Sequence, residues 1–337
     1  MKKLNVAVIG CGRISVMHFG AIENLEMANL VACCDIKEDR AKKYGEKYNV
    51  PYYTNYEEML SNEKIDAVNI CLPHYLHCKV ANYAISKGIK VLTEKPMDID
   101  YETAKNTVEY AKEKGVLFGV ISQCRYNNSA VLVKNALKQG KLGKILTARS
   151  ILTWSRSDSY YSQSDWKGTW DKEGGGVLID QAIHSVDLVN WMIDSEVEKI
   201  SCHMANRGHS IIKVEDTCEA FIEYKNGAKY AVYCMNNYAS DEPIEIKLFC
   251  EKGKVVFDYD DAYIYYNDGT TEEAHQDVVE YCEEGMDYWG FQHLKQLKQF
   301  YNACLGLEKL DLSGEEALKT HKIIMDMYAV GGMKKWN

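Results

Sequence analysis

A lysine that follows a short apolar run is the first candidate for chemistry. Lys90–Thr93 has the pattern of a strand, and Glu94, Lys95 and Pro96 come directly after it. The carboxyl ends of parallel strands border the ligand crevice of an open sheet, so we expect Lys95 to point toward bound substrate. A residue before proline is restricted to extended backbone, which fixes the direction of the lysine. The alternative is an ordinary solvated turn.

Three polar residues recur at helical spacing inside an apolar segment. The glycines at positions 174–176 lead into VLIDQAIHSVDLVNWMID, where Asp180, His184 and Asp187 stand at i, i+4 and i+7 of a helix that should be buried. Buried carboxylates and imidazoles must be hydrogen-bonded, and a self-satisfied Asp–His pair in a core is one explanation. The other is proton transfer by a His that an Asp holds in one tautomer. The glycines favour it, because they let another segment or a ligand approach.

A glycine-rich turn near the N-terminus is typical of a dinucleotide site. VAVIGCGRIS places Gly10, Gly12 and Ser15 as G-x-G-x-x-S between a strand and a helix, where a pyrophosphate can approach the helix N-terminus. Asp35 ends the second strand, and a carboxylate there binds ribose hydroxyls and repels a 2′-phosphate, which favours NAD. Three nearby cations leave room for NADP: Arg13, Lys37 and Arg40.

Composition restricts the class of protein. The chain has 337 residues, 46% of them hydrophobic, which is enough for two domains with sizeable cores. Its net charge of −9 argues against binding to nucleic acid or anionic membranes, which needs a basic face. The N-terminal apolar run breaks at Gly10, and no apolar stretch is long enough to span a membrane. We therefore expect a cytoplasmic protein.

The twelve cysteines are expected to be reduced thiols rather than a disulfide framework, because no secretory signal precedes them. Cys202, Cys218, Cys234 and Cys250 recur every sixteen residues, which raises a zinc hypothesis. Zinc sites usually draw ligands from close pairs, and the chain has no Cys-x-x-Cys. We expect instead that strands of similar length place small buried residues at similar depths, and we predict no metal.

The order of predicted elements indicates an α/β chain with two domains. Strand patterns at residues 4–10, 30–35, 66–72, 90–93 and 116–122 alternate with helices, one of which runs from an N-cap at Asp100 to Gly115. This alternation predicts a parallel, doubly wound sheet and a dinucleotide-binding domain over residues 1–123. After a helix at 129–139, strands at 145–154, 219–224, 229–235, 244–250 and 254–259 and two Asn/Asp-Gly turns predict an α+β domain with a mostly antiparallel sheet over residues 124–337.

Aromatic residues gather in the segment that follows the predicted strand at 145–154. RSDSYYSQSDWKGTW interleaves aromatic rings with charged groups, and it includes Trp166. Aromatic faces beside hydrogen-bonding groups suit sugar rings, although a loop that aromatics pin onto the sheet is an equal alternative. Arg125 and Tyr126, just beyond the sixth strand, add polar groups that could contact a substrate.

Taken together, these motifs resemble the glucose–fructose oxidoreductase/inositol dehydrogenase/rhizopine-catabolism (Gfo/Idh/MocA) family along the whole chain. The resemblance rests on the N-terminal G-x-G, LPHYLHCKVANYAISKGIKVLTEKP and GGGVLIDQAIHSVDLVNWM. It implies a Rossmann domain followed by a domain whose large open sheet is often used for oligomerisation, here a homodimer or homotetramer. It also implies that Lys95 lies beside the nicotinamide and the substrate hydroxyl, that Asp180 and His184 complete the site, and that Pro73 and His77 flank the nicotinamide.

The predicted reaction is hydride transfer between a secondary alcohol of a sugar, glycoside or cyclitol and the nicotinamide of NAD(P). His184 would remove the hydroxyl proton, Lys95 would stabilise the alkoxide, and Asp180 would orient one of them, with either Lys95 or His184 as the formal base. The predicted cofactor contacts are Gly10, Gly12, Arg13, Ile14, Asp35, Leu72, Pro73, His77, Glu94 and Lys95. The predicted substrate contacts are Lys95, Arg125, Tyr126, Trp166, Asp180 and His184.

Three other functions fit parts of the pattern. An NAD-dependent glycosidase of the same fold would oxidise and re-reduce its substrate. A sugar- or dinucleotide-sensing regulator would have lost catalysis, which the presence of Lys95, Asp180 and His184 argues against. A metal-dependent lyase that uses His74 and His77 is weaker, because this H-x-x-H lacks an evident third ligand.

Overall fold

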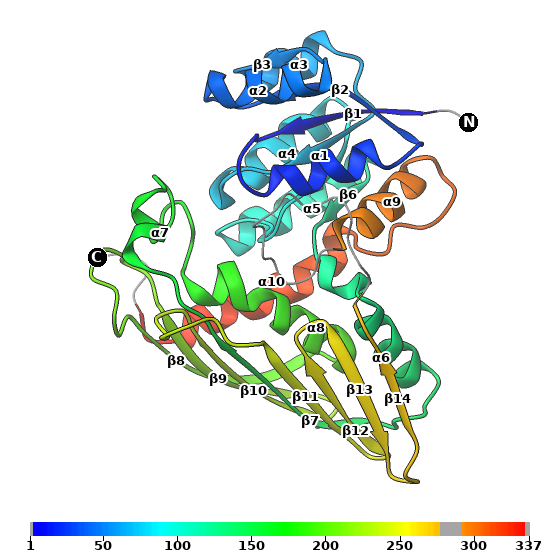
Figure 1. Ribbon diagram of the computed structural model, residues 1–337, viewed down its shortest axis with the longest axis vertical. Helices are drawn as coiled ribbons and strands as arrows, with labels where there is room; N and C mark the ends of the chain where they lie inside the picture. The colour runs from blue at the N-terminus through cyan, green and yellow to red at the C-terminus, as the bar shows by residue number, and fades with distance from the viewer. Residues whose placement is uncertain (1–2, 277–291, 334–337) are drawn as a thin grey trace. The chain divides into compact units, whose positions relative to one another are not determined.

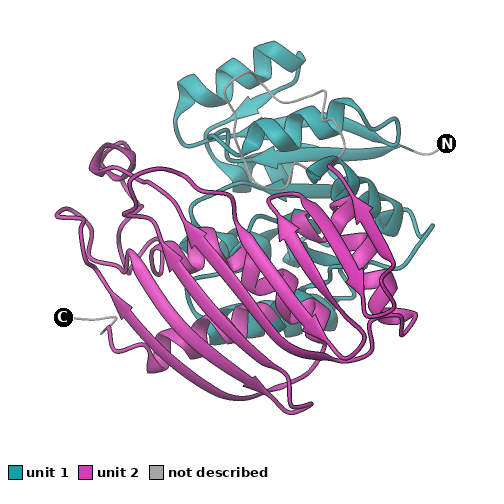
Figure 2. Ribbon diagram, turned by 60° about the horizontal axis from the view of Figure 1, so that its bottom comes forward, with its two compact units in different colours: residues 1–123, 279–319 teal, residues 124–278, 320–337 magenta. Residues whose placement is uncertain are grey.

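The computed structural model describes residues 3–276 and 292–333, and the chain divides into two compact units (Figure 2). The first comprises residues 1–123 and 279–319, and the second comprises residues 124–278 and 320–337. The chain thus returns to the first unit after the second sheet. The predicted division into residues 1–123 and 124–337 did not include this return. In the described ranges, no helix is both long and apolar enough to cross a membrane.

The first unit contains a six-stranded sheet in the order β3-β2-β1-β4-β5-β6, with every pair parallel. Figure 1 labels β1, β2, β3 and β6 of this sheet. The order reverses at β1, and at such a switch point the ends of two strands open a crevice for ligands. The predicted parallel sheet is confirmed, although the two-residue β3 was not predicted. The strands are β1 Leu4–Ile9, β2 Ala28–Cys34, β3 Tyr52–Tyr53, β4 Ala67–Ile70, β5 Lys90–Thr93 and β6 Phe118–Val120.

Helices connect these strands, and their ends follow local signals. α5 begins after Asp100, whose Oδ1 accepts a hydrogen bond from the amide of Thr103 at 2.8 Å, and it ends at Gly115 with φ of 64°. Both ends match the prediction. The helices of this unit are α1 Ser15–Glu23, α2 Glu38–Tyr48, α3 Tyr56–Asn62, the short η1 His74–Leu76, α4 His77–Ser86, α5 Tyr101–Lys114, α9 His293–Cys304 and the first part of α10 Gly314–Val330.

α9 completes the core of the first unit although it follows the second sheet in the sequence. It packs against α1, and its residues Leu297, Phe300 and Tyr301 are fully buried in the same core as the strands. The Tyr301 hydroxyl accepts a hydrogen bond from Asn69 Nδ2 on β4 at 2.9 Å. Burial of these large side chains gives the return of the chain a strong apolar driving force.

The second unit contains an eight-stranded sheet in the order β14-β13-β12-β11-β7-β10-β9-β8, in which only β7 and β10 are parallel. Glycines with positive φ form the two predicted hairpin turns, Gly227 at 89° and Gly269 at 90°. The mostly antiparallel sheet is confirmed, while β8, β13 and β14 were not predicted. The strands are β7 Ile145–Thr153, β8 Val197–Ala205, β9 Thr217–Tyr224, β10 Lys229–Met235, β11 Glu245–Cys250, β12 Gly253–Asp258, β13 Asp261–Tyr266 and β14 Thr271–Ala274.

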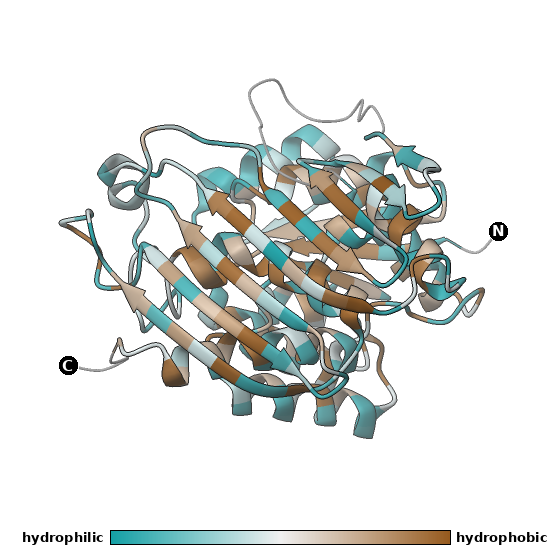
Figure 3. Cartoon of the chain, turned by 90° about the horizontal axis from the view of Figure 1, so that it is seen from below, coloured by the Kyte–Doolittle hydropathy of each residue, from teal (hydrophilic) through white to brown (hydrophobic). Residues whose placement is uncertain are grey.

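The two faces of this sheet differ in burial. Hydrophobic and hydrophilic residues alternate along several strands (Figure 3), and α6 Asn128–Lys138 and α8 Ile183–Ile193 pack on one face. The opposite face exposes Phe221, Phe249 and Tyr265. Assembly of a homodimer or homotetramer through this face stays a prediction.

The segment after the three glycines is helical, but its first turn is a π-helix at Leu178–Ala182 that continues into α8. A π-turn bonds residue i to i+5, so the predicted i, i+4, i+7 stripe is not one regular α-helical face. Asp187 separates from the other two polar residues and lies in the core. Both its oxygens accept hydrogen bonds from Arg125, at 2.7 and 2.6 Å, and Oδ1 also accepts from Thr320 at 2.8 Å.

We expect Arg125→Met to lower the free energy of unfolding by about 3–5 kcal/mol, because it leaves the buried Asp187 carboxylate uncompensated. Urea unfolding followed by circular dichroism measures the change. Lys112→Met is the matched control: it breaks an ion pair with Glu315 whose side chains are 76% and 60% exposed, and such pairs contribute about 0–1 kcal/mol. Equal effects of the two substitutions would show that the Arg125–Asp187 pair does not anchor the core.

Candidate active site

The glycine turn between β1 and α1 contains two glycines with different requirements. Gly10 has φ of 95°, and a Cβ there would lie 2.2 Å from the carbonyl oxygen of Cys71, so the protein's own backbone demands glycine. Among residues 3–276 and 292–333, and apart from its chain neighbours, a Cβ on Gly12 would meet no atom within 4 Å. The space beside Gly12 therefore stays open for a ligand at the start of α1. Arg13 is exposed and Ile14 half-buried in the same turn.

Asp35, directly after β2, is held beside this turn. Its Oδ2 accepts a hydrogen bond from the amide of Cys11 at 2.8 Å, and its Oδ1 accepts one from the amide of Lys37 at 2.8 Å. Each oxygen has a further lone pair that can accept from a ribose hydroxyl. The following residue, Ile36, is 86% exposed and offers an apolar surface next to the carboxylate. The chemistry of these residues fits the adenosine half of a dinucleotide.

His77 joins the loops that follow β4 and β5. Its Nδ1 lies 2.6 Å from the carbonyl oxygen of Pro96 and its Nε2 lies 2.7 Å from that of Leu72. Carbonyl oxygens only accept, so a doubly protonated ring satisfies both contacts, whereas burial lowers the pKa of His77 against the effect of the two carbonyls. His77 thus fixes two loops of the predicted cofactor site from inside, while Leu72 and Pro73 are half-buried. Neither ring nitrogen is left to bind a metal, which removes the basis of the lyase hypothesis.

Glu94 anchors the residue before the candidate lysine. Its Oε1 accepts hydrogen bonds from Nε2 of His18 at 2.9 Å and of His293 at 3.3 Å, and its Oε2 accepts from the amide of Lys95 at 3.2 Å. Burial alone would raise the pKa of Glu94, but the two histidines outweigh it and hold this pKa well below its usual value. Glu94 is therefore a buried carboxylate that fixes the backbone of Lys95. The sequence motif did not predict this role, because the two histidines that bind Glu94 are distant in the chain.

Within residues 3–276 and 292–333, His18, Glu94 and His293 form the one group whose atoms could hold a metal ion. Their hydrogen bonds already account for the arrangement, and neither His Nδ1 has a partner among the described residues. Metal-binding histidines usually donate that second N–H to an outer partner. Cys202 and Cys218 lie with their Sγ atoms 3.6 Å apart, but no cysteine of the described ranges belongs to a possible metal group.

Accessibility singles out the three predicted catalytic residues. Between Val91 and Asp98, Lys95 is half-buried and every other residue is buried. Between residues 173 and 190, the half-buried residues are Asp180 and His184, and all others are buried. Lys95 lies in the first unit, and Asp180 and His184 lie in the second. Polar groups that remain accessible inside buried segments are candidates for contact with a ligand.

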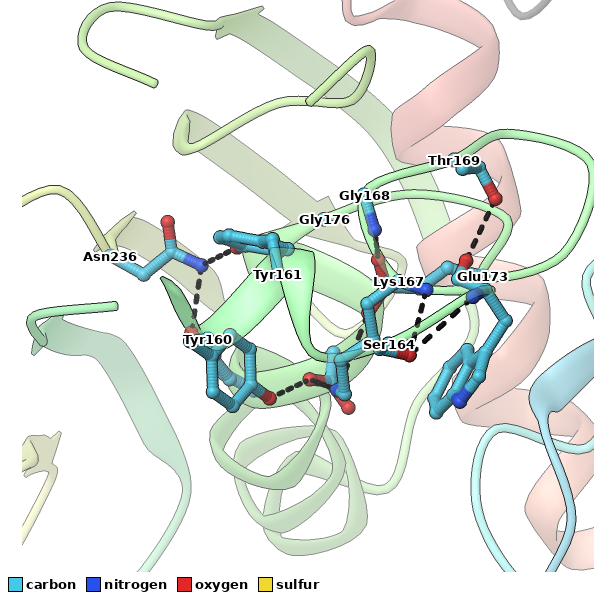
Figure 4. Close-up of polar contacts among 12 residues, drawn as sticks. Tyr160, Tyr161, Ser164, Lys167, Gly168, Thr169, Glu173, Gly176 and Asn236 are labelled. Carbon is cyan, nitrogen blue, oxygen red and sulfur yellow. Dashed lines mark hydrogen bonds and ion pairs between the residues drawn. The ribbon is translucent and has the colours of Figure 1, made fainter. Parts of the chain in front are cut away.

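Asp180 has two hydrogen-bond partners that we did not predict as site residues. Its Oδ2 accepts from Nζ of Lys167 at 2.7 Å and from the hydroxyl of Tyr160 at 3.2 Å. Figure 4 shows both donors beside the start of the helix. Burial raises the pKa of Tyr160 to about 12, so its hydroxyl stays protonated and donates. The loop sequence contains both residues, but only the fold reveals that they meet Asp180.

Two more carboxyl groups of the second unit, those of Glu173 and Glu215, are buried. Glu173 lies 3.5 Å from Nζ of Lys167 and accepts a hydrogen bond from the amide of Gly168. Burial raises its pKa to about 8, although Lys167 opposes the shift. Glu215 accepts from the amides of Gly176 at 2.9 Å and Leu178 at 3.1 Å, and burial raises its pKa to about 7. Glu215 thereby binds the first amides of the helix that carries the candidate residues.

The glycine run serves the protein's own packing. A Cβ on Gly175 would lie 2.0 Å from the hydroxyl of Tyr328, and one on Gly176 would lie 1.9 Å from the backbone oxygen of Glu215. The close approaches at these two glycines are thus made by Tyr328 and Glu215 of the same chain.

The remaining predicted substrate residues have different surroundings. Arg125 is 5% exposed and directs its guanidinium at Asp187, so its observed partner is structural. Tyr126 is half-buried at the end of the short η2 Gln123–Tyr126. Trp166 is half-buried, and Nζ of Lys167 lies 4.7 Å from its ring centroid. Contact of these three residues with a substrate stays a prediction.

Comparison with known proteins places this geometry in a family. Residues 4–122 match the oxidoreductase family with an NAD-binding Rossmann fold, and residues 131–256 match the Gfo/Idh/MocA C-terminal domain. The chain is 23% identical to myo-inositol 2-dehydrogenase of Thermotoga maritima over 93% of this chain and 92% of that protein. It is 26% identical to oxidoreductase P35 of Formosa agariphila over 84% and 88%.

Solved structures agree with this match. The WlbA dehydrogenase of Bordetella pertussis, in complex with NADH and UDP-GlcNAcA, has a TM-score of 0.84 and 27% identity, and covers 98% of this chain and 97% of its own. Levoglucosan dehydrogenase in complex with NADH and levoglucosan shares the fold, with a TM-score of 0.86 and 18% identity over 98% and 97% of the two chains. NAD binding by the first unit, expected from the glycine turn, is thus confirmed.

We expect Gly12→Ala to weaken NADH binding by about tenfold or more, because its methyl group enters the space that the pyrophosphate needs. The midpoint of thermal unfolding should stay unchanged, since no non-neighbouring atom of the described chain lies within 4 Å of that methyl. Gly10→Ala is the contrast, because its clash with Cys71 should destabilise the fold itself. Fluorescence titration with NADH and calorimetry measure the two effects, and unimpaired binding by the Gly12 variant would contradict the assignment.

We expect Glu173 to make stability depend on pH. Its pKa in the folded chain is raised from 4.5 to about 8, so it stabilises the fold below pH 4.5 and loses this contribution as the pH rises through 8. Urea unfolding of wild type should therefore show a larger loss of stability between about pH 6 and 9 than Glu173→Gln, whose amide does not titrate. Glu109→Gln, an exposed change on α5, should keep the wild-type slope.

Proposed function

The chain belongs to the Gfo/Idh/MocA family of NAD-binding oxidoreductases, and we propose that it transfers hydride between a secondary alcohol of a sugar, glycoside or cyclitol and NAD. One observation carries the proposal: Lys95, Asp180 and His184 are the residues that stay half-buried in two otherwise buried segments. An ammonium, a carboxylate and an imidazole can together remove a proton from a hydroxyl and stabilise the oxyanion.

The first unit supplies the cofactor site of this proposal. When bound, NAD supplies a hydride acceptor at its nicotinamide. Gly12 and the amides at the start of α1 would bind the pyrophosphate, and Asp35 would accept hydrogen bonds from the adenosine ribose. NAD is preferred to NADP because the Asp35 carboxylate is fixed by two backbone amides and would repel a 2′-phosphate. Leu72 and Pro73, in the loop that His77 holds, would line the nicotinamide side.

The three polar residues would divide the acid–base work. His184 would accept the hydroxyl proton, while Lys95, whose backbone Glu94 fixes, would donate hydrogen bonds to the developing alkoxide. Asp180 would stabilise the positive charge that appears on the imidazole. In the alternative assignment, Lys95 accepts the hydroxyl proton and His184 donates a hydrogen bond to the alkoxide. Both assignments require the same three side chains.

The choice of a carbohydrate rests on the loop before the glycine run and on relatives. Tyr160 and Trp166 place aromatic rings close to the Lys167 ammonium, at 4.9 and 4.7 Å from Nζ, a combination that suits the apolar and hydroxyl faces of a sugar. One relative is a myo-inositol dehydrogenase, and one solved neighbour carries a nucleotide-linked sugar acid. A substrate panel should therefore contain cyclitols, free sugars, glycosides and nucleotide sugars.

The panel test follows nicotinamide absorbance in the near ultraviolet after purified protein is mixed with NAD and each compound. Net formation of NADH with one class supports the dehydrogenase. Cleavage of a glycoside without net NADH would favour the glycosidase, and binding of cofactor and sugar without either product would favour the sensor.

With a compound that is turned over, we expect Lys95→Ala to lower kcat by about a thousandfold, because the alkoxide loses its hydrogen-bond donor. The affinity for NADH should change little, since the pyrophosphate and ribose contacts remain. Lys79→Ala, an exposed change on α4, is the control and should match wild type. Stopped-flow and steady-state kinetics give kcat, and turnover by the Lys95 variant at the wild-type rate would refute the assigned role.

A further inference from the structure

We propose that Lys167 is a positioning residue for Asp180: its ammonium fixes the orientation of this carboxylate and compensates its charge. The inference rests on the proposed dehydrogenase function, because it concerns the same site. It adds a lysine from the loop after α7, Asp158–Ser162, to the three groups that the sequence motifs supply.

The contact between Lys167 and Asp180 is close and largely shielded from water. Nζ lies 2.7 Å from Oδ2, and the two side chains are 16% and 12% exposed. Desolvation of both charges is costly, so a pair at this depth is stable only where the geometry is favourable and further partners are present. Tyr160 provides one such partner, since its hydroxyl donates to the same oxygen at 3.2 Å. Two donors on Oδ2 restrict rotation of the carboxylate.

The loop holds Lys167 in place before any substrate arrives. The Lys167 amide donates to Oγ of Ser164 at 3.3 Å, and the carbonyl oxygen of Gly168 accepts from the amide of Lys213 at 2.9 Å. The Tyr161 hydroxyl accepts from Nδ2 of Asn236, a buried residue directly after β10, at 2.7 Å, and Figure 4 shows this contact beside the loop. A lysine with a fixed backbone and aromatic rings on either side loses little further entropy when it binds a carboxylate.

One ammonium serves two carboxyl groups, and their environments differ. Asp180 lies 2.7 Å from Nζ and is half-buried, whereas Glu173 lies 3.5 Å from it and is 1% exposed. The lysine ammonium contacts Asp180 more closely than Glu173, and Asp180 is the more exposed of the two carboxyl groups. Glu173 retains its proton near neutral pH because burial raises its pKa to about 8, and the nearby Asp180 and Glu215 raise this pKa as well.

Lys167 therefore keeps its charge. Burial alone would lower its pKa, but Asp180, Tyr160 and Glu173 outweigh this effect and raise the pKa well above the usual value for lysine. The Asp180 carboxylate therefore has a cationic partner within the second unit. Loss of the ammonium would remove the cation that favours the ionised form of Asp180. It would also remove one of the two contacts that orient this carboxylate.

The test compares Lys167→Met and Lys167→Arg with Lys172→Met, a change in the same loop that removes a contact to the backbone oxygen of Asp165. With a substrate that wild type oxidises, Lys167→Met should lower kcat by about a hundredfold and move the acidic limb of the pH–rate profile up by about one pH unit. Lys167→Arg should restore most of the rate and the wild-type profile, because a guanidinium can also bind the carboxylate. Lys172→Met should match wild type.

A double-mutant cycle with Asp180→Asn decides whether Lys167 acts through Asp180. The double variant should be no slower than Asp180→Asn alone, since the lysine then has no carboxylate to position. Additive losses, or equal rates for the Lys167→Met and Lys172→Met variants, would overturn the proposal and leave the dehydrogenase function intact. Absence of turnover by wild type would overturn both. Should Lys167→Met lose its circular dichroism, Lys167→Gln takes its place in the same comparison.

Discussion

Asp187 accepts two hydrogen bonds from Arg125 and one from Thr320 inside the second unit, where an unpaired carboxylate would be strongly unfavourable. This pair fixes α8 against its surroundings, and the same continuous helical segment carries Asp180 and His184. Glu215 holds the other end of the segment through the first helical amides. The position of the two candidate groups therefore depends on buried carboxylates that do no chemistry themselves.

In the first unit, histidines fix the backbone on either side of Lys95. Glu94 is buried directly before it, and His18 from α1 and His293 from α9 satisfy one of its oxygens. His77 joins the loop after β5 to the loop after β4 through two carbonyl oxygens. Contacts from helices that are distant in sequence thus converge on the end of β5 and fix the backbone at Glu94 and Lys95.

Local signals in the sequence predict the elements and the motifs well. Strand–helix alternation, the Asp100 and Gly115 helix ends and the hairpin glycines all depend on neighbouring residues, so they can be read from the chain. The partners of the site cannot, because Lys167 meets Asp180 and Tyr328 meets Gly175 only after the chain folds. The π-turn at Leu178–Ala182 was missed for a related reason: it breaks the regular helical spacing that the prediction assumed.

The two glycines of the N-terminal turn differ in why a glycine is needed: Gly10 is required by the fold, whereas Gly12 is expected to serve cofactor binding. Gly10 is required by a backbone oxygen 2.2 Å from where its Cβ would be, so it would be present in this fold whether or not a ligand bound. A Cβ on Gly12 would meet nothing within 4 Å among the described residues beyond its chain neighbours, so their packing does not require a glycine there. The same contrast distinguishes Asp187, whose oxygens are satisfied in the core, from Asp180, which is paired but remains accessible. Gly12 is evidence for a ligand because the described residues do not require a glycine there. Asp180 differs, because Lys167 and Tyr160 already contact it and it is a candidate only through the exposure that it keeps.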